Sequence, residues 1–147
     1  MIVVDTSVWI CALRSASGPE AVTLRQLLDA DDVALAVPVR TELLMGARAT
    51  ERVKLEKELK GLPLLYPTDE SWRTIDHWTE RASRAGATFA IGDLIIGVLA
   101  ADIGGLVWSL DGDFDRMARL QLVDLFVGPN FRAGRLTPTE QRQTRTL

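Results

Sequence analysis

Five acidic residues stand at positions where parallel α/β folds place their active sites: Asp5, Glu42, Asp93, Asp111 and Asp113. Asp5 and Asp111 directly follow apolar runs that predict strands, and Glu42 and Asp93 stand in the first turns of predicted helices. Ligand sites in such folds lie beyond the carboxyl ends of the strands. Carboxylates that meet there repel one another, and a hard divalent cation with oxygen ligands, Mg²⁺ or Mn²⁺, removes the repulsion. The pattern therefore predicts a metal centre that activates water.

Each acid also has an ordinary structural explanation when it is taken alone. Asp5 and Asp93 can cap the helices that follow them, Glu42 can complement a helix dipole, and Asp111 can begin a turn. Asp93, however, heads the most apolar stretch of the chain, and no lysine follows Lys60. A buried carboxylate without a partner is costly, so the five acids together favour a shared metal site over separate caps.

The amino-acid composition excludes several other kinds of site. The 147 residues include one cysteine, Cys11, and one histidine, His77. An intramolecular disulfide, a Cys/His zinc site and a nuclease with a histidine pair are therefore excluded. His77 lies opposite an apolar helix face and is expected at the surface, and Cys11 is expected to be a buried, reduced thiol. The chemistry has to come from carboxylates, hydroxyls, basic side chains or an oxygen-bound metal.

Three known Asp-containing motifs fail to explain the segment that begins at Asp111. An EF-hand loop needs glycine at its sixth position and glutamate at its twelfth, where this chain has Arg116 and Leu122. A receiver domain needs a lysine after a late strand, and an aspartyl phosphatase needs most of its domain after this point. Neither requirement is met.

The apolar patterns predict strands alternating with helices in a single α/β domain, which implies a parallel sheet with helices on both faces. The predicted strands are residues 2–5, 33–37, 62–66, 106–110 and 122–127. The predicted helices are the segment after a capping box at Ser17 and Glu20, and residues 38–47, 50–60, 72–86, 92–104 and 114–120. Gly97 inside an apolar helix indicates close packing of the backbone, and Trp72 and Trp78 share an apolar stripe that is expected in the core.

No segment approaches the ~20 apolar residues of a membrane span, and no targeting segment is evident, so the chain is expected to be cytoplasmic.

Four motifs in order resemble those of PIN-domain ribonucleases. The first is Asp5-Thr6-Ser7-Val8-Trp9-Ile10 and the second is Glu42-Leu43-Leu44-Met45-Gly46. The third runs from Gly92 to Gly97, and the fourth from Leu106 to Phe114, with Ser109 where threonine is usual and Asp111 where many members have asparagine. The short chain is similar to VapC-type toxins of bacterial toxin–antitoxin pairs.

The resemblance implies a Mg²⁺- or Mn²⁺-dependent endoribonuclease that leaves a 5′-phosphate and a 3′-hydroxyl. It implies the strand order 3-2-1-4-5, which puts Asp5 and Asp111 side by side, a small VapB-like antitoxin as partner and a homodimer. The predicted catalytic residues are Asp5, Glu42, Asp93 and Asp111, and the predicted metal ligands are Asp5, Asp93, Asp111 and Asp113. For substrate binding the candidates are Ser7, Arg14, Arg48 and Arg116, because a hydroxyl or a guanidinium can hold a phosphate.

The distribution of charge agrees with this interpretation. The chain has 17 basic and 20 acidic side chains and a net charge of −3, which alone argues against a nucleic-acid partner. The predicted nuclease domain, residues 1–131, contains the five candidate acids, whereas the predicted polar tail, residues 132–147, has four arginines and one glutamate. A bound divalent cation would therefore cancel the acidity where it is concentrated.

Two alternatives remain at this point: a catalytically silent PIN-like module that only binds a partner protein, and a phosphatase or DNA nuclease that uses the same carboxylates.

Overall fold

The computed structural model describes residues 1–129 and contains a parallel four-stranded sheet in the order β3-β2-β1-β4. The strands are β1 (Ile2–Val4), β2 (Val33–Ala36), β3 (Leu64–Leu65) and β4 (Leu106–Trp108). Ile2 of β1 is level with Val33 on one side and Leu106 on the other. Strands β1 and β2 are apolar and buried at every position, as expected for a parallel sheet covered on both faces. The predicted order is confirmed for these four strands.

The predicted fifth strand, residues 122–127, forms only an isolated parallel bridge from Leu125 to Val107. Two backbone hydrogen bonds hold this segment beside β4, from Val107 N to the Asp124 carbonyl and from Phe126 N to the Val107 carbonyl. Gly128 and Pro129 then follow at once, and proline cannot donate a further ladder bond. The segment lies where the order 3-2-1-4-5 puts it, but it is too short to be a strand.

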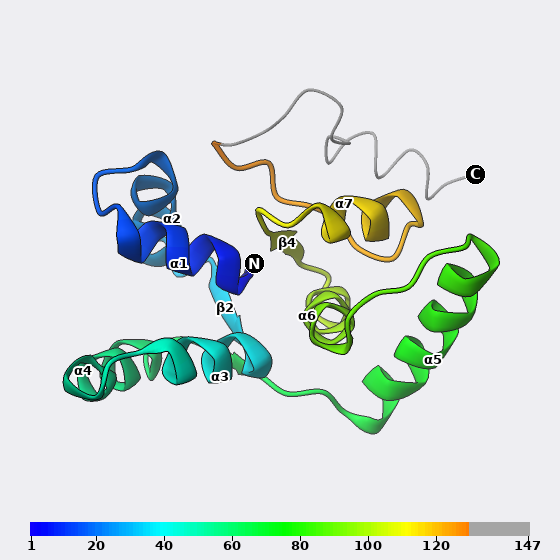
Figure 1. Cartoon of the computed structure of the whole chain (residues 1–147), viewed down its shortest axis with the longest axis horizontal. Helices are drawn as coiled ribbons and strands as arrows, with labels where there is room; N and C mark the ends of the chain where they lie inside the picture. Colours follow the sequence, from blue (N-terminus) through cyan, green and yellow to red (C-terminus); the bar gives the residue numbers. More distant parts are fainter. Residues whose placement is uncertain (130–147) are drawn as a thin grey trace.

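Seven helices surround the sheet within residues 1–129: α1 (Thr6–Arg14), α2 (Pro19–Asp29), α3 (Val37–Gly46), α4 (Ala49–Leu59), α5 (Asp69–Arg84), α6 (Ile91–Asp102) and α7 (Gly112–Arg119). In Figure 1, β2 is seen between α1–α2 and α3, and β4 between α7 and α6. None of these helices combines the length and the apolar character that crossing a bilayer requires.

One predicted helix start is wrong. The sequence predicts a capping box at Ser17 and Glu20, but α2 begins at Pro19 with Gly18 at the N-cap and no side-chain cap. Proline is favoured at the first helical position because its fixed φ matches the helix and its missing N–H is not needed there. Pro19 therefore sets the helix start, and the N-cap lies at Gly18, one residue after the expected cap at Ser17.

Helix α6 lies in the centre of the molecule, between α3, α5 and α7 (Figure 1). Gly97 in its middle is buried, and a Cβ built there would lie 2.7 Å from Met117 Cε and 3.2 Å from Trp78 Cζ3. The close packing predicted for Gly97 is confirmed, since a larger residue there would press on side chains of α5 and α7. This packing fixes the position of α6, and with it the acid in its first turn.

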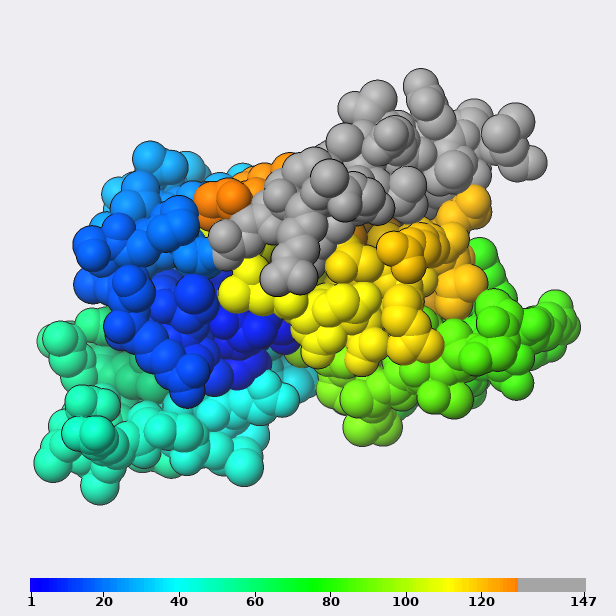
Figure 2. Space-filling model, turned by 45° about the horizontal axis from the view of Figure 1, so that its top comes forward, coloured from blue at the N-terminus to red at the C-terminus, as the bar shows by residue number. Residues whose placement is uncertain are grey.

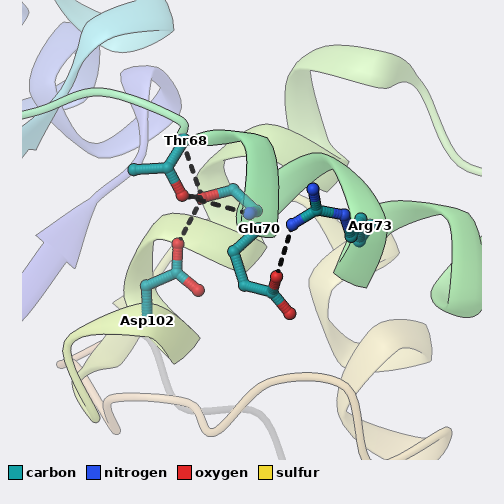
Figure 3. A network of polar contacts seen from close by, with 5 residues as sticks. Thr68, Glu70, Arg73 and Asp102 are labelled. Atoms are coloured by element: carbon teal, nitrogen blue, oxygen red, sulfur yellow. Dashed lines mark hydrogen bonds and ion pairs between the residues drawn. The ribbon is translucent and has the colours of Figure 1, made fainter.

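A second contact joins α5 to the C-terminal end of α6 (Figure 3). Thr68 and Ser71 form a capping box at the start of α5, and Ser71 Oγ also donates to Asp102 Oδ2 over 2.6 Å. Ser71 is completely buried, whereas Trp72 is 40% exposed. The prediction that Trp72 lies in the core is therefore wrong, because the hydroxyl beside it occupies the inward position.

Cys11 is half-buried rather than fully buried. Burial and the nearby Glu20 carboxylate raise the pKa of its thiol, which favours the protonated form. His77 is exposed, as its position opposite the apolar stripe predicts.

Candidate active site

Asp5 and Asp111 lie at one edge of the sheet because β1 and β4 are parallel neighbours. Val4 is level with Trp108, and Asp5 N donates to the Trp108 carbonyl over 2.8 Å. Strands β1 and β4 both end at this edge, and each is followed by a helix, β1 by α1 and β4 by α7. The space-filling view shows the surfaces of these two helices, dark blue and yellow, bordering one another (Figure 2).

Two serine hydroxyls hold the carboxylate of Asp5. Ser7 Oγ and Ser109 Oγ donate to Asp5 Oδ2 over 2.7 and 2.8 Å, and Asp5 is only 7% exposed. The same hydroxyls accept hydrogen bonds from Leu110 N and Asp111 N. Asp5 stands at the N-cap position of α1 but makes no capping bond, and Ser7 lies inside α1. The two serines therefore fix both the carboxylate and the backbone that leads to Asp111.

Asp111 has a structural role as well as a place in the acidic group. Its Oδ1 accepts a hydrogen bond from Asp113 N over 2.9 Å and caps the start of α7. A carboxylate at a helix N-terminus is stabilised by the helix dipole. This cap explains why Asp111 and Asp113 keep a fixed relation to one another.

Asp93 completes a compact group of carboxylates. It stands in the first turn of α6, whose N-cap is Ala90, so it is not the cap that its sequence position also allowed. One oxygen from each of Asp93, Asp111 and Asp113 lies within 4.8 Å of the others. Three carboxylates at this spacing suit a divalent cation that takes oxygen ligands. Asp5 and Glu42 lie outside this triplet, although both act on Asp93 electrostatically.

The environment of Asp93 raises its pKa from 3.8 to about 6. Burial is the largest cause, followed by the negative charges of Asp5, Asp111, Asp113 and Glu42. Both causes disfavour the charged form of the carboxyl. A bound cation would reverse the second cause, so the protein without metal carries repulsion that metal binding relieves.

The affinity of the site for Mn²⁺ should fall about tenfold between pH 7 and pH 5, because one ligand with a pKa near 6 must lose its proton before it binds. Isothermal titration calorimetry with Mn²⁺ at several pH values checks this expectation. The fall should centre on pH 6, and the Asp93→Asn variant should show a flatter and weaker profile. An affinity that stays constant down to pH 5 would contradict the assignment of Asp93 as a ligand.

Glu42 lies apart from the triplet, on the exposed face of α3. It lines a groove of about 550 Å³ between α1 and α3–α4, beside Ile10, Leu13 and Arg14. Its charge still contributes to the raised pKa of Asp93. The structure therefore places Glu42 at the rim of the acidic site rather than inside it.

The three candidate arginines occupy different places. Arg14 lines the groove with Glu42, and Arg48 stands exposed at the N-cap position of α4. Arg116 Nη1 lies 2.9 Å from Asp113 Oδ1, so it is the arginine that reaches the acidic triplet.

The sequence interpretation missed Phe89, in the loop between α5 and α6. The guanidinium carbon of Arg116 lies 5.1 Å from the centre of the Phe89 ring. A single aromatic residue in a loop carries no periodic signal, and Phe89 is separated from Arg116 by the whole of α6 and β4. Nothing in the sequence pattern could have paired the two side chains.

The sequence is similar to a known protein family and to proteins named as ribonucleases. The family model described as "PIN domain" matches residues 2–120. The chain is 35% identical over 125 residues to VapC ribonuclease Mb1587 of Mycobacterium bovis, a match that covers 82% of this chain and 93% of that protein. It is 36% identical over 124 residues to ribonuclease VapC18 of Mycobacterium tuberculosis, covering 80% and 87% of the two chains.

Solved structures show the same fold at low identity. The crystal structure of VapBC2 from Rickettsia felis, bound to a DNA fragment from the promoter, aligns with a TM-score of 0.71 at 17% identity and covers 86% of this chain and 98% of that chain. FitAcB from Neisseria gonorrhoeae aligns with a TM-score of 0.69 at 21% identity, covering 89% and 100%.

Proposed function

The chain belongs to the PIN-domain family, and from that premise we propose that it is an endoribonuclease, the toxin of a toxin–antitoxin pair. The observation that carries this function is the group of Asp93, Asp111 and Asp113 beside the buried Asp5. The relatives of more than 30% identity, which the chain covers almost from end to end, are named VapC ribonucleases. A silent binding module would not need to keep four mutually repelling carboxylates.

The roles of the side chains follow from their positions. Asp93, Asp111 and Asp113 would hold a divalent cation, with Asp5 as a further ligand whose orientation Ser7 and Ser109 fix. The cation would supply two things, a lowered pKa for the attacking water and compensation of charge on the scissile phosphate. Glu42, at the rim, would hold or orient a ligand through water. With no histidine among these groups, the carboxylates are the acceptors available for the proton of the attacking water.

Mg²⁺ or Mn²⁺ is the ion that this donor set favours. All the candidate ligands are carboxylate oxygens, and Cys11 and His77 lie elsewhere in the fold. Hard oxygen ligands suit Mg²⁺ and Mn²⁺, whereas Zn²⁺ sites usually include sulfur or nitrogen.

The proposed partners are RNA, as substrate, and a small antitoxin that covers the acidic site. The similar fold of VapBC2 from Rickettsia felis supports a protein of the VapB type as the partner here. We also propose a homodimer and a cytoplasmic location, as the resemblance to VapC-type toxins implies. The Arg-containing segment 132–147 lies outside the described residues, and the boundary of the nuclease domain at residue 131 stays a prediction.

A panel of nucleic acids tests the proposed function. Purified protein is incubated with single-stranded RNA, single-stranded DNA and double-stranded DNA in Mg²⁺, in Mn²⁺ and in EDTA. The expected result is internal cleavage of RNA with either metal, with 5′-phosphate ends and no cleavage in EDTA. Equal cleavage of DNA would favour a general nuclease, and undiminished RNA cleavage in EDTA would refute the metal mechanism.

A further inference from the structure

Arg116 is held beside the acidic triplet by partners from two different elements. Its Nη1 lies 2.9 Å from Asp113 Oδ1, one turn earlier on α7, and its guanidinium carbon lies 5.1 Å from the Phe89 ring centre. An exposed ion pair between residues three apart on a helix contributes little to stability, too little to order a long side chain by itself. Phe89 is half-buried and packs against the hydrophobic core. The aromatic ring therefore gives the guanidinium a fixed surface on which to rest.

The position of Arg116 suits contact with a ligand. Among the ion pairs of residues 1–129, the Arg116–Asp113 pair is the one that involves an acid of the triplet. The Arg116 side chain is nevertheless 43% exposed, so it faces solvent at the border of the carboxylates. A guanidinium has five N–H donors in a planar fork, and one carboxylate oxygen on one edge does not use them all.

The chemistry of that border fits a phosphodiester. The carboxylates repel an RNA strand, and a phosphate next to them needs compensating positive charge. Phosphoryl transfer gains from cations aimed at the oxygens where charge develops, and arginine matches phosphate with two parallel hydrogen bonds.

We propose that Arg116 contacts the phosphate backbone of the RNA at the scissile position, and that Phe89 is the positioning residue that holds Arg116 there. This inference rests on the proposed ribonuclease function and deepens it. Arg116 would be a catalytic residue, whereas Phe89 would act only through Arg116. The Phe89–Arg116 pair explains why an aromatic side chain stands in the loop immediately before the helix that carries Asp93.

RNA binding without metal tests the proposal apart from cleavage. Fluorescence anisotropy with a labelled single-stranded RNA oligonucleotide in EDTA gives the Kd at several salt concentrations. We expect Arg116→Gln to weaken binding and to reduce the slope of log K against log salt by about 0.7, the contribution of one phosphate contact on a single strand. Phe89→Leu should weaken binding about two- to fivefold, the equivalent of a lost cation–π contact, and Phe89→Tyr should restore the wild-type Kd.

The rate of RNA cleavage gives a second readout, separate from RNA binding. Arg116→Gln should lower kcat/KM for RNA about a hundredfold, with Arg116→Lys intermediate and with an unchanged melting temperature. The matched control is Arg119→Gln, which removes the same charge from an exposed position in the last turn of α7 and should leave the Kd, the salt slope and kcat/KM unchanged.

Three results would overturn the proposal. The first is an RNA affinity and salt slope that are the same for Arg116→Gln and Arg119→Gln. The second is failure of tyrosine to replace Phe89. The third is tighter Mn²⁺ binding by Arg116→Gln with unaltered RNA binding, which would make Arg116 a counter-ion of Asp113 only. If the wild-type protein binds RNA in the expected way but does not cleave it, the ribonuclease function fails while the phosphate contact stands.

Discussion

Replacement of Asp5 by asparagine should lower RNA cleavage by about 10²–10³-fold, the usual loss when one charged group of a catalytic site is removed. Asparagine has the same shape, and its amide oxygen can still accept the hydrogen bonds from Ser7 and Ser109 that now reach Asp5 Oδ2. The variant therefore loses the charge and keeps the local structure. Cleavage of an RNA oligonucleotide in Mn²⁺ measures the loss, and growth after expression in bacteria gives a second readout, because the variant should not arrest growth.

The matched control is Asp76→Asn, which removes the same charge from an exposed position on α5. It should cleave RNA and arrest growth like the wild-type protein. If Asp5→Asn kept full activity, Asp5 could not be a ligand, and its contacts to the serine hydroxyls would be purely structural.

The sequence was sufficient to predict the position of the acids because the information is local. A short apolar run that ends in an acid, found once near the start of the chain and again after α6, identifies the carboxyl ends of two strands. A parallel sheet brings such ends to the same edge, and the Val4–Trp108 register does so here for Asp5 and Asp111. Gly97 was equally informative, since glycine inside an apolar helix needs a close neighbour.

Contacts between distant segments could not be predicted in the same way. Ser71 reaches Asp102 across the α5–α6 interface. Phe89 contacts Arg116, although α6 and β4 separate the two residues along the chain. Periodicity alone places Trp72 on the apolar face of α5, but the hydrogen bond to Asp102 turns Ser71 inward instead. Single side-chain contacts of this kind depend on how helices are rotated and spaced, which the pattern of apolar residues does not specify.

The division between Asp5 and the acidic triplet is also a product of tertiary structure. The sequence assigned Asp5 and Asp93 to the same metal site, yet Asp5 is bound by two hydroxyls, whereas Asp93 has a raised pKa. Within residues 1–129 no basic side chain forms an ion pair with Asp93. The carboxylate of Asp93 therefore has the most to gain from a cation and costs the most stability when none is bound.

Asp93→Asn should lower RNA cleavage about as much as Asp5→Asn does. At the same time it should stabilise the metal-free protein at pH 7. The folded-state pKa of Asp93 is raised from 3.8 to about 6. The cost to folding therefore builds up as the pH rises from 3.8 to about 6 and is present in full at pH 7. It disappears only at a pH well below 3.8, where the carboxyl is protonated in both states. We expect the variant to gain about 1 kcal/mol of unfolding free energy at pH 7, a discounted figure because Asp93 is only half-buried and water screens part of the repulsion.

Urea unfolding in EDTA at pH 4 and pH 7 checks the sign of this effect. The gain should be present at pH 7 and several-fold smaller at pH 4, whereas added Mn²⁺ should stabilise the wild-type protein and have little effect on the variant, because a ligand that binds only the folded state raises stability. Asp76→Asn serves again as the control and should show no such dependence on pH. A variant that is less stable than the wild-type protein at pH 7 would mean that Asp93 holds the fold together, and its place in a metal site would have to be abandoned.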